Sequence, residues 1–177
     1  MKKVIALVLF FHNMASSFGQ AAKIESMIDS LKYLRTDNLD CSADLYWRII
    51  AKGDKAIPFL IDRLTDTTPT GVIDHCKKTI LNVGELSQFA LVQIADFPAF
   101  LVTKLQFDYI IIDETGKACS NFYDFFFMNS NKQRYQTDVR NWYTKQKLKY
   151  KREKISVESQ TQCQKKYGIA THYRLTE

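Results

Sequence analysis

The sequence predicts an all-α protein: a compact bundle of helical hairpins followed by a loosely attached C-terminal tail. The first observation is spacing. Apolar residues recur at positions i, i+3, i+4 and i+7 in residues 23–34, and similar stripes return downstream, as is typical of amphipathic helices. The second is composition, because three prolines and six glycines are too few for the many turns of an all-β fold. With 177 residues, 46% of them hydrophobic, one domain can bury a substantial core.

Residues 1–20 have the order of a secretory signal peptide. Lys2 and Lys3 give a positive start, residues 4–11 are uninterruptedly apolar, and small and polar residues follow as far as Gln20. The apolar run is too short to span a membrane, which takes roughly 20 apolar residues, and no later stretch is long enough either. We therefore expect export to the periplasm or the cell exterior after cleavage. The alternative is that this run forms a buried element of the fold.

Three helices are predicted in the first half of the mature chain. The stripe in residues 23–34 predicts the first, and a comparable stripe predicts a second over 42–52. A third covers 55–64, with Pro58 in its first turn, where the missing N–H costs little. Residues 65–71 are capping and turn residues and predict a loop.

The second half continues the helical pattern, with helices expected over 84–95, 98–104 and, as the longest, 132–149. Residues 107–113 contain three consecutive isoleucines and fit either a short strand or the last turns of a helix. Residues 155–177 show no clear period and predict the tail. The core is expected to contain Leu45, Ile49, Ile57, Leu60, Ile61, Leu64, Phe89, Ile94, Leu101, Leu105 and Trp142.

A short pattern occurs twice in the chain. Residues 59–64 and 100–105 both read Phe-Leu-aliphatic-polar-basic-Leu, and a proline precedes each copy, at Pro58 and Pro98. Periods of about 40–47 residues with two helices in each unit are typical of HEAT and armadillo repeats. The pattern therefore favours stacked helical hairpins.

Residues 53–64 resemble the second half of a HEAT repeat, in which a helical hairpin turns at a glycine. The resemblance covers roughly residues 42–105. It implies hairpins at about 42–64 and 84–105 within a helical domain of residues 21–154. It also implies protein–protein interaction, although a fold alone does not fix a function.

Four cysteines remain after the predicted cleavage. An even number in an exported protein permits two disulfides, and the absence of any Cys-x-x-Cys pair argues against a zinc knuckle or a thioredoxin-like site. Three full pairings exist, and four free thiols are the alternative. The pairing that we favour joins Cys76 to Cys119, because both lie in expected loops, whereas Cys41 begins a helix and Cys163 lies in the tail.

Asp74, His75 and Cys76 form the only cluster of ligand-type side chains. A metal or a Cys-His nucleophile would use such residues. Adjacent residues rarely point at one centre, however, so a loop histidine beside a disulfide cysteine is the favoured interpretation. No phosphate loop, dinucleotide fingerprint or His-Glu-x-x-His sequence occurs, and no cofactor or metal is expected.

Residues 132–154 are strongly basic, with nine lysines and arginines against two acidic residues, interleaved with aromatic residues. Such a mixture can bind phosphate backbones and stack bases. Tyr135 and Trp142 have helical core spacing, however, and export removes most nucleic acid from reach, so nucleic acid is not the expected partner. A solvated basic face is preferred, followed by a face for anionic envelope surfaces or an acidic protein. The candidate binding residues are Arg140, Lys145, Lys147 and Lys149.

These observations predict an exported helical binding or scaffold module for a protein partner in the cell envelope, with no evident chemistry. Two other functions remain open. One is an envelope enzyme with its site near Asp74, His75 and Cys76. The other is a small inhibitor or immunity-type protein.

Overall fold

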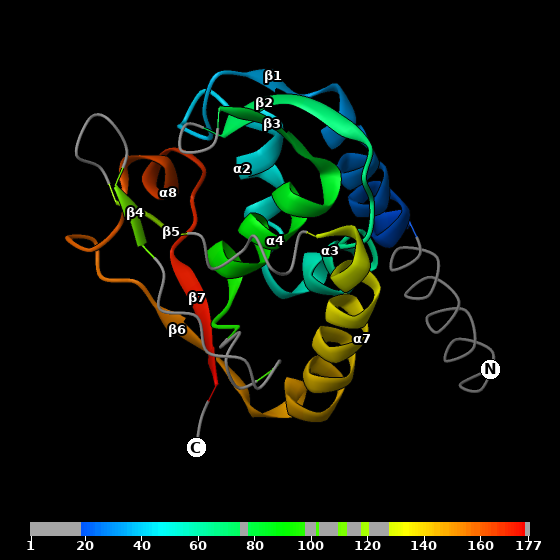
Figure 1. Ribbon diagram of the computed structural model, residues 1–177. Coiled ribbons are helices and arrows are strands. Elements are labelled where there is room, and N and C mark those ends of the chain that lie inside the picture. The colour runs from blue at the N-terminus through cyan, green and yellow to red at the C-terminus, as the bar shows by residue number, and fades with distance from the viewer. Residues whose placement is uncertain are drawn as a thin grey trace, which may run out of the picture.

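The chain folds into a mixture of helices and small sheets (Figure 1). The computed structural model describes residues 19–74, 78–97, 102, 110–112, 118–120 and 128–175. The helices are 19–29, η1 (Ser30–Tyr33), α2 (Asp44–Ile50), η2 (Gly53–Ala56), α3 (Ile57–Asp62), α4 (Val83–Ile94), α7 (Asn129–Gln146), η4 (Lys147–Lys149) and α8 (Gln162–Lys166). The strands are β1 (Arg35–Thr36), β2 (Pro69–Asp74), β3 (Thr79–Asn82), β4 (Ile110–Ile112), β5 (Ala118–Ser120), β6 (Tyr150–Lys154) and β7 (Thr171–Leu175).

These strands show that the all-α prediction is wrong, and with it the HEAT resemblance. The antiparallel strands β2 and β3 lie between the two expected helical hairpins, and β2 begins inside the loop predicted over 65–71. The signal for β2 is weak because one of its two buried residues, Thr70, is polar, whereas the hydrophobic Ile73 is exposed. Most of the expected helix 98–104 lies outside the described residues.

The strands β1, β2 and β3 form one sheet, with β2 in the middle. Strand β1 runs parallel to β2 and places Arg35 opposite Gly71. A Cβ atom at residue 71 would lie 2.9 Å from the carbonyl oxygen of Leu34 and would collide with the Arg35 side chain. Glycine therefore permits this close approach, which holds the chain leaving the first helix beside β2.

The helices supply most of the hydrophobic core. The helix 19–29 and η1 bury Ile24, Ile28 and Leu31, members of the stripe that predicted this helix. The core prediction is also confirmed for Ile49, Ile57, Leu60, Ile61, Leu64 and Ile94, which are all buried. Leu45, Phe89 and Trp142 are partly buried against the same cluster, and Leu101 and Leu105 lie outside the described residues.

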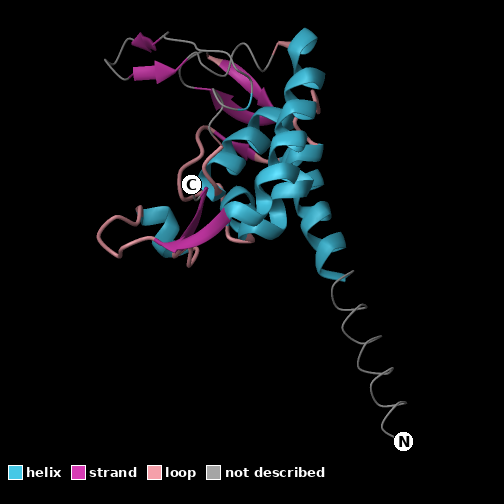
Figure 2. Ribbon diagram, turned by 90° about the horizontal axis from the view of Figure 1, so that it is seen from below, coloured by secondary structure: helices cyan, strands magenta, loops and turns pink. Residues whose placement is uncertain are grey.

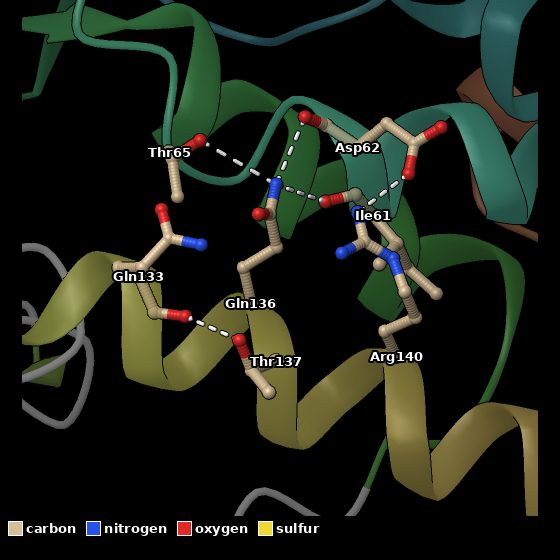
Figure 3. A network of polar contacts seen from close by, with 7 residues as sticks. All are labelled: Ile61, Asp62, Thr65, Gln133, Gln136, Thr137 and Arg140. Atoms are coloured by element: carbon tan, nitrogen blue, oxygen red, sulfur yellow. Dashed lines mark hydrogen bonds and ion pairs between the residues drawn. The ribbon is translucent and has the colours of Figure 1, made fainter.

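Helix α7 is joined to α3 by a buried glutamine (Figure 3). The side-chain amide of Gln136 donates to the carbonyl oxygens of Ile61 and Asp62, at 3.0 and 2.9 Å. Arg140, one turn further along α7, forms an ion pair of 2.7 Å with Asp62. The carbonyl oxygens in the last turn of a helix lack hydrogen-bond donors within that helix. Gln136 of α7 supplies donors to two of these oxygens at the end of α3.

The prediction of a loose C-terminal tail is also wrong. A disulfide joins Cys163 in α8 to Cys41, just before α2, and Tyr167 stacks on Trp47 with ring centroids 6.3 Å apart. Ile169 is buried. Strand β7 then pairs with β6 along its whole length, and this two-stranded sheet lies beside the helices (Figure 2). The segment carries few apolar residues, so its sequence gave no sign of this attachment.

Two further predicted segments can be placed. The isoleucines that fit either a strand or a helix form β4, which pairs with β5. Residues 1–18, which include most of the predicted signal peptide, lie outside the described residues. Among the residues that the structure does describe, no helix has the length and apolar character needed to cross a bilayer.

Candidate functional site

A polar pocket of about 380 Å³ lies between the turn from α2 to η2 and the sheet formed by β6 and β7. Its walls come from segments that are distant in the sequence: the first helix, the α2–η2 turn, β6, and the chain from Gly168 into β7. The charged and hydroxyl groups that line it are Lys52, Asp54, Lys55, Arg152, Thr171 and Tyr173.

The α2–η2 turn depends on a glycine. Gly53 has a φ of 60°, a left-handed conformation that side-chain-bearing residues rarely adopt. A Cβ atom here would also lie 3.3 Å from the ring of Tyr173, closer than most such contacts. The sharp turn ends α2 and places Lys52, Asp54 and Lys55 side by side at the pocket.

The pocket has more positive than negative charge, and its one carboxylate is already engaged. The hydroxyl of Tyr173 donates to Asp54 Oδ1 at 3.1 Å. Burial and the Asp54 charge raise the pKa of Tyr173, so this hydroxyl keeps its proton and remains a donor. Arg152 donates to the hydroxyl of Thr171, and Lys55 to the amide oxygen of Gln20, both at 3.1 Å.

No acidic side chain in the described part of the protein neutralises these three cations. Within the described ranges, Lys52, Lys55 and Arg152 form no ion pair. A cluster of uncompensated cations in a hollow attracts anions, such as carboxylate or phosphate groups. The arrangement can therefore bind an anionic group.

The opposite face of the β6–β7 sheet is fixed to the end of α4. His172 Nε2 lies 2.9 Å from Asp96 Oδ1, and its Nδ1 lies 3.3 Å from the carbonyl oxygen of Gln93. Arg174 extends between Asp96 and Glu153, at 3.7 and 3.4 Å. These polar contacts hold β7 in place and leave the other face of the sheet to form the pocket wall.

An aromatic cluster fixes the start of β6. Tyr150 packs against Phe97, Trp142 and Tyr143, with ring centroids 5.9 to 6.1 Å apart. Its hydroxyl donates to the carbonyl oxygen of Asp96 at 2.7 Å. Burial raises the pKa of both tyrosines, Tyr150 and Tyr143. Because these rings pack against one another, they stabilise the fold around the start of β6.

The four predicted binding residues differ in their surroundings: Arg140 has an acidic partner close by, whereas the three lysines lie further along the chain, at the end of α7 and in η4. Arg140 pairs with Asp62 at the contact between α7 and α3, and its charge is therefore compensated. Lys147 lines a shallow hollow of about 230 Å³ beside that pair. Lys145 and Lys149 are exposed near the junction of α7 with η4. Only the lysines of η4 continue directly into the basic strand β6.

The predicted Asp74 cluster is only partly described. Asp74 ends β2, whereas His75, Cys76 and the side chain of Cys119 lie outside the described residues. The favoured Cys76–Cys119 bridge therefore stays a prediction. The Cys41–Cys163 disulfide leaves it as the one intramolecular pairing still available to those two cysteines. No group of three or more potential metal ligands occurs among the described residues.

The sequence analysis did not predict that Lys52, Lys55 and Arg152 lie at the same pocket. Each is an ordinary surface residue in its own segment, and about 100 residues separate the turn from β6. The sharp glycine turn at Gly53 was visible, but the strand that faces it was not.

Comparison with protein-family models, with curated proteins and with solved structures gives no match. The function of this protein must therefore be inferred from the geometry of the pocket and the neighbouring basic strand.

Proposed function

We propose that this protein is an exported binding module that binds an acidic protein partner in the cell envelope. The binding surface is the basic ribbon, which we define as Lys147, Lys149, Lys151, Arg152 and Lys154, together with the pocket that Arg152 borders. The partner is bound by complementary charge, and no reaction is part of the proposal.

The observation that carries this proposal is the uncompensated charge of four members of the ribbon. Lys147, Lys151, Arg152 and Lys154 form no ion pair among the described residues, while the single acid in β6, Glu153, pairs with Arg174. Lys52 and Lys55 add two more cations at the adjoining pocket. Such a field speeds encounter with acidic surfaces and selects against basic ones.

Export is supported by two independent features. The order of charge, apolar run and small residues in residues 1–20 is that of a signal peptide. The Cys41–Cys163 disulfide is compatible with an oxidising compartment, where such bonds persist.

The proposal can be tested with a defined probe. A fluorescent eight-residue peptide rich in glutamate is titrated with the mature protein, and its anisotropy is compared with that of the glutamine counterpart. We expect the acidic peptide to bind, the neutral one not to bind, and the affinity to fall as salt is raised, because exposed charges are screened over about 8 Å at physiological ionic strength.

A pair of charge-matched variants locates the surface. Lys147→Glu with Lys149→Glu should weaken binding at least tenfold. Lys23→Glu with Lys32→Glu changes the net charge equally on the exposed part of the first helix and η1, and should change affinity less than threefold. Equal losses in both variants, or equal binding of the two peptides, would show that the ribbon is not a specific site.

A further inference from the structure

We propose that the acidic partner binds by strand addition, as an extended segment that pairs with the free edge of β6. This inference rests on the proposed function and adds the mode of binding. It requires that backbone groups of β6 point away from β7, that nothing in the described structure covers them, and that the neighbouring charges select an acidic segment.

The register shows which backbone groups face outward. The N–H of Ile155 donates to the carbonyl oxygen of Ala170 at 2.9 Å, and these two residues continue the β6–β7 register by one pair beyond Lys154 and Thr171. In an antiparallel pair of strands, every second residue points its backbone N–H and C=O groups at the partner strand. The backbone groups of Glu153 and Lys151 therefore also face β7. The N–H and C=O groups of Arg152 and Lys154 therefore point to the opposite side, along the free edge.

The other edge of the sheet is already occupied. Strand β7 forms a parallel bridge with Ala95, and the N–H of Asp96 donates to the carbonyl oxygen of Tyr173 at 3.0 Å. Residues 151–154 of β6 are exposed, and β6 has no strand partner besides β7 within the described part of the chain. In Figure 1, β7 lies nearer to α4 than β6 does. The edge available for a further strand is therefore that of β6.

Charge decides which strand can pair there. Lysines on an edge strand commonly prevent pairing with unrelated strands. The same side chains complement an acidic segment, and like charges oppose antiparallel pairing of β6 with a second copy of itself. An extended segment rich in aspartate or glutamate is thus the occupant that fits.

The edge is also held ready for binding. Contacts on both faces fix β7: His172 to Asp96 on one, and Tyr173 to Asp54 on the other. The Cys41–Cys163 disulfide anchors α8, which precedes β7. A strand that is already ordered loses little further freedom on binding, and this saves part of the entropic cost of association.

Amide hydrogen exchange tests the geometry directly, with the same acidic peptide as probe. We expect saturating peptide to slow exchange at the outward amides of Arg152 and Lys154 at least tenfold. The amides of Lys151 and Glu153 already bond to β7 and serve as internal controls that should change little. Binding without protection of the two outward amides would overturn strand addition while leaving the proposed function standing.

A backbone variant gives the second measurement. Lys154→Pro removes an outward N–H without removing a β6–β7 bond, and Lys154→Ala removes the same charge while keeping the N–H. We expect the proline variant to bind the peptide about three- to tenfold more weakly than the alanine variant. Equal affinities of the two folded variants would contradict the inference.

Two other occupants are tested in the same assay. Vesicles containing phosphatidylglycerol that bind the protein in place of the peptide would overturn the inference, as would dimerisation through β6 that protects the two outward amides without peptide. Failure of the acidic peptide to bind at all would refute both this inference and the proposed function.

Discussion

At the scale of single residues, Lys132 is an unusual member of the core. Only 4% of it is exposed, although it carries an ammonium group. Burial lowers its pKa from the usual 10.5, while the nearby carboxylates of Glu85 and Asp66 act in the opposite direction. Because burial dominates, the charged form of this lysine is less stable in the folded protein than in the unfolded chain.

Replacing Lys132 with methionine should therefore leave the free energy of unfolding equal or higher at pH 7, since a buried charge is exchanged for an apolar chain of similar length. Between the lowered pKa and 10.5, the unfolded wild-type chain binds more protons than the folded one. The wild type should thus gain stability relative to the variant as pH rises through this range. Urea denaturation at several pH values measures the difference, and a variant that is less stable at pH 7 would contradict the argument.

At the scale of elements, most helices were predictable, whereas of the strands only the isoleucine segment that forms β4 was considered from the sequence. The spacing of Ile24, Ile28 and Leu31 predicts a helix, because apolar residues that recur on one face with the helical period are a sufficient signal. Strand β6 has no such face, since the four residues after Tyr150 are all charged and exposed. Its pairing with β7 is a tertiary contact, which the local sequence does not encode.

The contact between α7 and α3 should depend on Gln136. Changing it to alanine removes the donors to the carbonyl oxygens of Ile61 and Asp62 and leaves both carbonyls poorly solvated. We expect a loss of about 1–3 kcal/mol in the free energy of unfolding. Thr137→Ala is the matched control, because that exposed hydroxyl bonds only within its own helix. Its effect should stay within about 0.5 kcal/mol, and similar losses in the two variants would refute the role of Gln136.

At the scale of the whole molecule, the candidate site exists because the C-terminal segment returns to the turn between α2 and η2. The cations of the pocket could each be found in the sequence, as could the basic stretch that contains Arg152. Their proximity could not, because it requires α8 and β7 to return to α2. The sequence predicts a loose tail there, because the anchors of this segment are a disulfide, one ring stack and one buried isoleucine, none of which produces a periodic pattern.

Removing the disulfide should loosen this return. It closes a loop with a sequence separation of 122 residues, and the variant Cys41→Ser with Cys163→Ser should lose about 2–5 kcal/mol in stability. Trp47 reports the local effect, because Tyr167, four residues after Cys163, stacks on it. We expect its fluorescence to change at lower urea concentration in the variant, and identical unfolding curves would contradict this expectation.

The most direct test of the arrangement on which the binding proposal depends is peptide mapping of the exported protein without reductant. We predict one linked pair of peptides containing Cys41 and Cys163, with Cys76 and Cys119 linked to each other as the remaining pair. Recovery of Cys163 as a free thiol, or linked to Cys76 or Cys119, would contradict the account, because β6 and β7 would then lack the anchor that places their free edge and basic pocket beside α2.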